Sequence, residues 1–523
     1  MQHHNVMRTA IVVGLTTSMC LVAPITSFAA QNLESTIEID TEKTGELLIE
    51  GLYKNGVLNK TWNDLIKENI IFVSDAEIYT NPELAPEILI GDLIIPKFNV
   101  PTTLKANAFA NCAGLTSISL PNNMTAIKSS AFRNCSSLIE VLIPESVTEI
   151  GTLAFSGCSS LERIKIGNKV NSVGTLAFDE CVSLESVYIG SNVKSIGKYA
   201  FYNCPSLKNV VFAEDSQLKK IEKSTFERCI SLELIKIPAN VETIEKHAFR
   251  NCDSLKEVQF HPNSKLKIIG EGAFSLLDSL EHIKLPSNLK TISPKAFRNC
   301  SNLKTVVIPK STETIGMNAF QNCSALSSVT IASDSTLKVI ENNAFERCSN
   351  LLEINIPAMV QKIGEYAFYQ CESLESVNFN KDSDLEIIST NAFRGCKKIK
   401  ELHLSNVSEI QNGAFYGCLS LTTVELPDNL KTIGNSAFGY NLKLKNIKYN
   451  GTKDQWESIL KGNDWNQGIL ANDIDCLDDT VAEDKVEFPT FNTKKPQEKI
   501  ADCVETAFIF IGKAACKLFS SLF

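Results

Sequence analysis

Cysteine is the most conspicuous reactive residue type, with 17 thiols in a chain of 523 residues. Thiols in a regular series could form disulfide bonds or bind a metal. Thirteen of the cysteines form a regular series. If successive repeats stack, the side chains of this series would point the same way, and an odd number cannot pair completely. No two of the thirteen lie at zinc-ligand spacing. The two other positions of the series hold Leu277 and Asn441, so the position accepts an apolar residue. We therefore interpret the series as a ladder of reduced, buried thiols. Its members each follow a phenylalanine by three residues: Cys112, Cys135, Cys158, Cys181, Cys204, Cys229, Cys252, Cys300, Cys323, Cys348, Cys371, Cys396 and Cys418.

The other residues that could do chemistry are scattered. After the predicted leader, the histidines fall in separate repeats, and no zinc-protease motif, phosphate-binding loop or nucleophile elbow is present. The sequence therefore predicts no enzyme, no catalytic residues, no metal and no cofactor. Four polar pairs could supply oxygen ligands for calcium, but two or three repeats separate them, and ordinary turns explain them better. These pairs are Asp215-Ser216, Asn263-Ser264, Asp334-Ser335 and Asp382-Ser383.

A repeat of 22 to 25 residues must position all of these groups. Each unit carries L-x-x-V-x-I, which alternates apolar and open positions as a half-buried strand does, and a following Pro often ends the strand. The segment x-x-A-F-x-N-C predicts a short helical turn. A bundle of helices fits less well, because apolar residues at spacing two followed by Pro do not suit a helix. The repeat is marked by Phe109, Phe132, Phe155, Phe178, Phe201, Phe226, Phe249, Phe274, Phe297, Phe320, Phe345, Phe368, Phe393, Phe415 and Phe438.

This period predicts a repeat solenoid in which each unit buries its apolar face against its neighbours. We expect a right-handed, β-rich coil with one short parallel strand and one helical turn in each 23–25-residue repeat. The array of about 15 repeats should occupy 104–449, after a lead-in or N-terminal cap at 31–103. Residues 450–478 should cap the other end. There Trp456 and Trp465 favour a hydrophobic lid over a sugar-stacking site.

The two ends carry targeting and linker signals. Residues 1–30 read as a secretory signal peptide removed near Ala29/Ala30, which predicts a secreted or cell-surface protein. Residues 479–500 are polar and Pro-containing and predict a linker. Residues 501–523 place apolar residues at helical spacing, interrupted by lysines. They predict an amphipathic C-terminal helix that either contacts a membrane or envelope, or packs on the array or another copy.

Charge argues against nucleic acid as a partner. The full chain has a formal net charge of −9, and losing one arginine with the signal peptide leaves 50 basic and 60 acidic residues, a net of −10. The basic residues are interspersed rather than gathered in a patch.

The exposed side of the strands is the candidate ligand-binding surface. Positions before and after the buried Val of each strand should point outward and mix aromatic, aliphatic and charged groups, as protein-binding faces do. The alternative is an ordinary solvated sheet face. We expect one contiguous patch across four repeats, made of Arg163, Lys165, Tyr188, Val211, Leu234 and Lys236.

The unit L-x-x-V-x-I-P-x-x-V-x-x-I-G-x-x-A-F-x-N-C-x-S, nearly intact from Leu138 through Cys158, resembles the BspA-like leucine-rich repeat family. The segment Y-x-G-T-x-x-Q-W at Tyr449 to Trp456 resembles the segment that closes such arrays. The resemblance implies a surface or secreted protein of a host-associated organism, with an adhesive role toward host protein or cell-surface ligands and in virulence. The alternative is a structural or self-associating envelope protein without a dedicated ligand.

Overall fold

The structure, a computed structural model, describes residues 51–471 and 473–480. The predicted signal peptide, C-terminal helix and most of the linker lie outside the described residues. The chain divides into two compact units, 1–477 and 478–523, and the coils described below belong to the first. Among the described residues, no helix is both long and apolar enough to cross a membrane.

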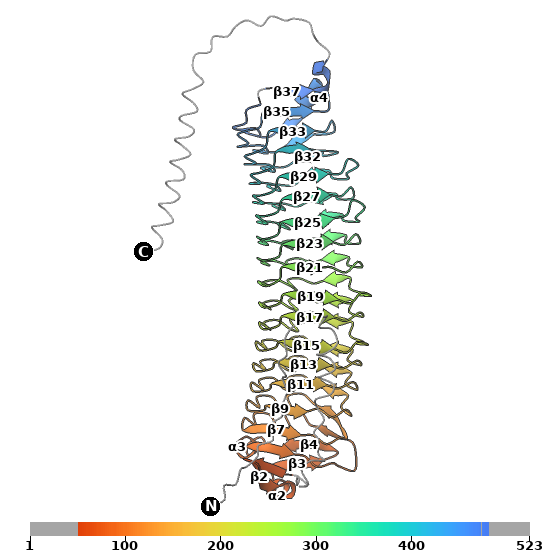
Figure 1. The fold of residues 1–523 in the computed structure, drawn as a ribbon, viewed down its shortest axis with the longest axis vertical. Helices are drawn as coiled ribbons and strands as arrows, with labels where there is room; N and C mark the ends of the chain where they lie inside the picture. Colours follow the sequence, from red (N-terminus) through yellow and green to blue (C-terminus); the bar gives the residue numbers. More distant parts are fainter. Residues whose placement is uncertain (1–50, 472, 481–523) are drawn as a thin grey trace, which may run out of the picture. The chain divides into compact units, whose positions relative to one another are not determined.

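The chain winds into stacked coils, as predicted for a solenoid (Figure 1). The V-x-I segment of each coil forms a strand that pairs in parallel with the same segment of a neighbouring coil. We call this the first ladder. Its strands are β5 (Gly91–Ile94), β7 (Leu115–Ser119), β9 (Glu140–Leu142), β11 (Arg163–Ile166), β13 (Ser186–Ile189), β15 (Asn209–Phe212), β17 (Leu234–Ile237), β19 (Glu257–Phe260), β21 (His282–Lys284), β23 (Thr305–Ile308), β25 (Ser328–Ile331), β27 (Glu353–Ile356), β29 (Ser376–Phe379), β31 (Glu401–His403), β33 (Thr423–Leu426), β35 (Asn446–Tyr449) and β37 (Ile474–Cys476).

Each coil also contains a second, shorter strand that the sequence did not reveal. From β6 to β34 it ends at the buried residue five positions before the repeat Phe, and most copies have two residues, which are too few to show alternation. This second ladder consists of β6 (Thr102–Leu104), β8 (Met124–Ile127), β10 (Glu149–Ile150), β12 (Ser172–Val173), β14 (Ser195–Ile196), β16 (Lys220–Ile221), β18 (Thr243–Ile244), β20 (Ile268–Ile269), β22 (Thr291–Ile292), β24 (Thr314–Ile315), β26 (Val339–Ile340), β28 (Lys362–Ile363), β30 (Ile387–Ile388), β32 (Glu409–Ile410), β34 (Thr432–Ile433) and β36 (Leu460–Lys461).

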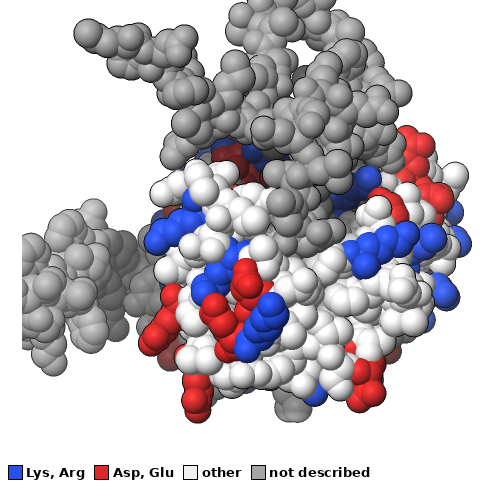
Figure 2. All heavy atoms as spheres, turned by 90° about the horizontal axis from the view of Figure 1, so that it is seen from below, with Lys and Arg blue, Asp and Glu red and all other residues white. Residues whose placement is uncertain are grey.

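Two antiparallel hairpins begin the stack. β1 (Gly51–Lys54) pairs with β2 (Val57–Thr61) and with β5, while β3 (Ile71–Ser74) pairs with β4 (Glu77–Thr80). β4 in turn pairs in parallel with β6 of the second ladder. Between the hairpins lies α2 (Trp62–Lys67), which begins with a capping box between Thr61 and Asp64; α3 (Ala85–Ile88) follows β4. Acidic and basic side chains are interspersed on the end of the molecule seen in Figure 2.

Aromatic rings lie against the last coil. Beyond Phe438 the chain forms α4 (Lys453–Ser458), β36, β37 and a 3₁₀ turn (Leu477–Thr480). The Trp465 ring packs edge-on against Phe438 at 6.3 Å, and Trp456 packs against Trp465 at 5.8 Å. This packing covers the apolar end of the Phe column, as a hydrophobic lid would.

The core is a column of phenylalanines. From Phe109 to Phe438, successive ring centroids lie 5.0–5.5 Å apart with interplanar angles of 1–16°. That separation fits the 4.7–4.9 Å spacing of paired strands with a small ring offset. The repeat Phe residues are at most 1% exposed. Each coil therefore contributes one ring to a continuous apolar spine.

The Ala-Phe segment is not the helical turn that the sequence suggested. The amides of Ser130, Phe132 and Asn134 bond to carbonyls of the next coil, whereas those of Ala131 and Arg133 close turns on residues three positions earlier. This alternation places two residues of every coil in the left-handed region, two positions before and two after the Phe, with φ of 53–76°. Asn tolerates this conformation better than most residues, which explains the Asn before so many of the cysteines.

Asn251 provides a test of this constraint. Its φ is 58°, and its amide donates to the Ser275 carbonyl of the next coil. We expect Asn251→Ala to lower the free energy of unfolding by about 1 kcal/mol, because a Cβ without a local hydrogen-bonding group is disfavoured there. Urea denaturation measures this loss. Asn251→Gly should lose much less, and an equal loss in both variants would show that the left-handed backbone is not the cause.

Candidate functional site

The outward side of the first ladder, here called the strand face, holds the six residues predicted to form a patch. Lys165, Tyr188 and Val211 are direct register partners on β11, β13 and β15. Arg163 lies on β11, while Leu234 and Lys236 lie on β17, which does not pair with β15. The structure therefore places three of the six residues in one column of register partners. A break in the first ladder separates these three from Leu234 and Lys236.

The patch differs from expectation in accessibility. Tyr188 is only 4% exposed, so its ring offers little surface to a partner. Arg163 is paired with Glu162 at 3.3 Å and Lys165 with Glu145 at 3.4 Å. Alternation along a strand gives the direction of a side chain, and it does not give its accessibility or its ion pairs.

The first ladder is interrupted at regular places. Parallel pairing stops after β15, β19, β25 and β29, and also between β9 and β11. The first four of these strands belong to the coils of 25 residues, whose two extra residues follow directly after the strand. In contrast, the second ladder runs unbroken from β16 to β36. Three of the four longer coils thus separate strands on one side of the stack only, whereas at the first of them the second ladder is also interrupted, between β14 and β16.

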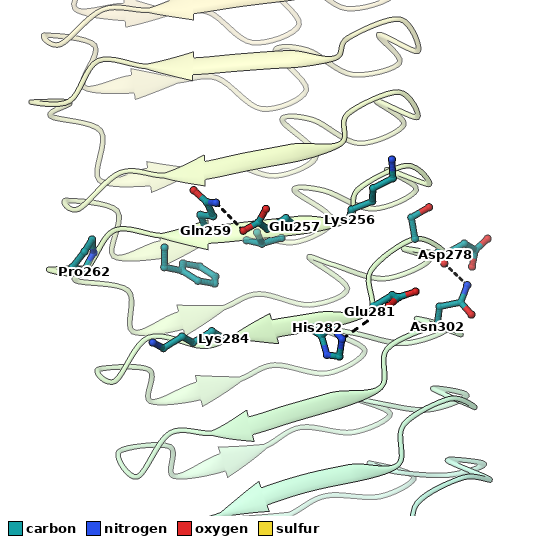
Figure 3. A pocket seen from close by; sticks show the side chains of 12 residues that line it. Lys256, Glu257, Gln259, Pro262, Asp278, Glu281, His282, Lys284 and Asn302 are labelled. Carbon is teal, nitrogen blue, oxygen red and sulfur yellow. Dashed lines mark hydrogen bonds and ion pairs between the residues drawn. The ribbon is translucent and has the colours of Figure 1, made fainter. Parts of the chain in front are cut away.

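A groove of about 1020 Å³ lies at one of these breaks, between β19 and β21 (Figure 3). Glu257 and Gln259 project from the first strand and His282 and Lys284 from the second. Phe260 also lines the groove. Gln259 donates to Glu257 at 2.7 Å, and His282 Nδ1 lies 2.9 Å from the Thr305 hydroxyl.

Two lysines are available for a partner, one lining this groove and one on the neighbouring strand β17. Lys236 is the register partner of Gln259, and Lys284 lines the groove. Within residues 51–471 and 473–480, neither ammonium group makes an ion pair. The sequence analysis placed Lys236 in the predicted patch, but the patch included none of the residues that line the groove. The spacing of 25 residues between Phe249 and Phe274 was the signal that could have located it.

The polar pairs in the longer coils act as turns. Ser216, Ser264, Ser335 and Ser383 are 1–5% exposed. Each hydroxyl accepts the amide of the Leu two residues later at 3.1–3.4 Å. No cluster of three or more possible metal ligands occurs among the described residues.

The thirteen thiols of the ladder are free and buried, as expected. They are also hydrogen-bond donors, which the sequence did not indicate. From Cys135 to Cys418, each Sγ donates to the carbonyl oxygen of the repeat Phe in the preceding coil at 3.0–3.5 Å. Burial raises the pKa of the Cys112 and Cys158 thiols to about 12.

The ladder thiols should therefore be unreactive in the native protein. A thiol of pKa about 12 is a thiolate in about one molecule in ten thousand at pH 8, and only the thiolate reacts. We expect iodoacetamide to leave Cys112 to Cys418 unmodified under native conditions and to modify them in guanidinium chloride. Mass spectrometry of the alkylated peptides reads this out. Rapid native labelling of peptides around Cys158 would contradict the buried ladder.

A second surface is formed by the residues two before and one after each repeat Phe, here called the turn face. A pocket of about 520 Å³ opens in it across four coils, between Leu176 and His247. Asp179 lines this pocket, and burial together with the nearby Glu180 carboxylate raises the Asp179 pKa to about 6, against a smaller effect of the Ser156 hydroxyl. Sequence reasoning missed this pocket because it considered only the strand face.

The raised pKa means that folding disfavours the ionised form of Asp179. The penalty is absent below pH 3.8 and complete once the pH has risen through about 6. Asp179→Asn should thus stabilise the protein at pH 7 by about 1–2 kcal/mol, after discounting for partial solvent exposure, and have little effect at pH 3.5. The measurement is the difference in unfolding free energy between variant and wild type across this range. A difference independent of pH would contradict the assignment.

Comparisons with known proteins agree with this architecture. A family model described as a BspA type leucine-rich repeat region matches residues 102–231, 219–351 and 338–459, more than half of the chain. A leucine-rich repeat protein from Bacteroides ovatus is 26% identical, with a TM-score of 0.52 over 72% of this chain and 97% of that one.

Two further solved structures align at lower similarity. A leucine-rich cell surface protein from Faecalibacterium prausnitzii is 22% identical, with a TM-score of 0.31 over 75% of this chain and 97% of that one. The pneumococcal vaccine antigen PcpA is 20% identical, with a TM-score of 0.33 over 78% and 97%. No curated protein matches the chain.

Proposed function

Because the chain belongs to the BspA-type leucine-rich repeat family, we propose that it is a secreted or cell-surface adhesin that binds a macromolecule through its strand face. The ligand is a host protein or another cell-surface molecule. Members of this fold family generally serve protein interactions. The proposal for this chain rests on one observation, the groove between β19 and β21 with unpaired lysines beside it.

The chemistry of the groove indicates the kind of surface it accepts. Lys236 lies on β17 and Lys284 on β21, the strands of the coils before and after β19, which holds Gln259. An incoming carboxylate would gain two charge-assisted partners without breaking an existing ion pair. Phe260 adds apolar surface beside them. We infer that the ligand presents acidic side chains next to an apolar one. The binding region is then centred on β19 and β21, one and two coils beyond β17, the last strand of the patch predicted from the sequence.

The test is a binding screen of the full chain against immobilised extracellular-matrix proteins and intact host cells. We expect Lys236→Glu with Lys284→Glu to weaken binding more than tenfold, because two attractive contacts become repulsive. Lys431→Glu is the matched control, since Lys431 is exposed beside the second ladder. It changes the net charge in the same direction and should have less than a twofold effect. Surface plasmon resonance gives the dissociation constants.

Two outcomes would count against this function. Equal binding by wild type and the double variant would remove the groove as the site. A chain that binds no matrix protein or cell but sediments as an oligomer would favour a self-associating envelope protein. The exposed leucines at the C-terminal end of the array, Leu460, Leu470 and Leu477, support that second interpretation.

A further inference from the structure

The turn-face pocket brings together aromatic and polar groups that the strand-face function does not use. Tyr199 and Tyr202 come from one coil, and their rings pack edge to face at 5.7 Å and 75°. Ser224 and Glu227 hold the same two positions in the next coil, and His247 follows in the coil after that. The pocket volume of about 520 Å³ lies within the range of small-molecule sites.

Tyr199 occupies a position that is unfavourable for an aromatic residue. It is one of the left-handed positions, with φ of 60°, where other coils often carry Asn, Ser or Gly. A bulky residue in this conformation costs of order 1–3 kcal/mol. The Tyr199 ring contacts Tyr202 and the Lys223 ammonium group, which lies 5.2 Å from the ring centroid, and it lines the pocket.

The polar groups of the pocket are partly prepared for a ligand. Glu227 is 7% exposed, and its carboxylate accepts from Arg250 at 3.0 Å while its other oxygen lies 4.0 Å from His247 Nδ1. Ser224 is fully buried, and its hydroxyl oxygen has no hydrogen-bond partner. An unsatisfied buried hydroxyl costs about 1–3 kcal/mol, which a ligand hydroxyl could recover.

The balance of charge narrows the ligand class. Asp179, Glu180 and Glu227 face Lys223 and Lys246 around the pocket, so donors and acceptors of both signs surround it. An anionic ligand would approach three carboxyl groups, and a cationic one would approach two ammonium groups. A neutral polyol avoids both conflicts, because each hydroxyl can donate to a carboxylate and accept from an ammonium group.

We propose that this pocket is a binding site for a neutral saccharide, with the apolar face of a sugar ring against the tyrosines and its hydroxyls bonded to Glu227 and Ser224. Tyrosine suits this role because its ring is apolar and its hydroxyl is polar. The site is separate from the strand-face groove, which lies on the first ladder between β19 and β21.

The chain contains its own control for this site. Tyr366 and Tyr369 repeat the same pair in the same register, with rings 5.5 Å apart at 75°. The coil that follows them holds Asn391 and Arg394 where the first site has Ser224 and Glu227. A response confined to the first pair would therefore identify the pocket rather than a tyrosine pair in general.

The experiment titrates the full chain with cellotriose, maltotriose, mannotriose, chitotriose and N-acetyllactosamine, followed by saturation-transfer NMR and calorimetry. We expect at least one of these to bind with a dissociation constant below about 1 mM. Tyr202→Ala should weaken that binding at least about tenfold, whereas Tyr369→Ala should change it less than twofold. Glu227→Gln, which preserves the side-chain shape, should weaken it about fivefold.

Circular dichroism and the thermal midpoint check that each variant is folded. If Tyr202→Ala does not fold, Glu227→Gln is used as the test variant in its place. The proposal is overturned if none of the five saccharides binds at about 10 mM. It is equally overturned if Tyr202→Ala and Tyr369→Ala weaken binding by the same factor.

Discussion

The carbonyl oxygen of each repeat phenylalanine is the point on which the stack depends. It lies inside the spine, where an acceptor that lacks a donor is costly. In most coils it receives the amide of the cysteine three residues later, for example Cys135 to Phe132 at 3.1 Å. The thiol of the next coil donates to the same oxygen, as Cys158 does to Phe132. The Phe ring and the Cys thiol thus act together: the ring packs successive coils against each other, and the thiol supplies a hydrogen bond to a buried backbone carbonyl.

This device constrains the rest of the turn face. Because every second amide of the Ala-Phe segment bonds to the next coil, the residues that supply those amides on either side of the Phe must adopt positive φ. Small or Asn side chains suit these positions, and the array uses them in many coils. Where a coil places Tyr there instead, at Tyr199 or Tyr366, backbone geometry offers no reason for the choice. The same regularity that builds the core therefore makes departures from it informative.

The sequence predicted the repeated core but missed the short second strands and the local features of individual coils. Fifteen copies of Phe and the alternation around Val141 were enough to predict stacked parallel strands and a buried spine. The two-residue second strands escaped because they are too short to show a period. The burial of Tyr188 was not predicted, because the accessibility of a side chain depends on its neighbours in space, which the alternation along a strand does not show. The turn-face pocket escaped because its residues, such as Asp179 and Glu227, meet only when four coils are stacked in register.

The longer coils explain how a uniform array acquires a local site. Two extra residues after β19 form a turn closed by the buried Ser264 hydroxyl, which holds the amide of Leu266. The addition leaves the Phe column and the second ladder intact, since Phe249 and Phe274 still stack at 5.3 Å. The strands alone lose their pairing, and the groove with Lys284 lies at that place. Insertions that spare the spine can thus vary the binding surface without a large loss of stability, because each coil interacts only with its neighbours.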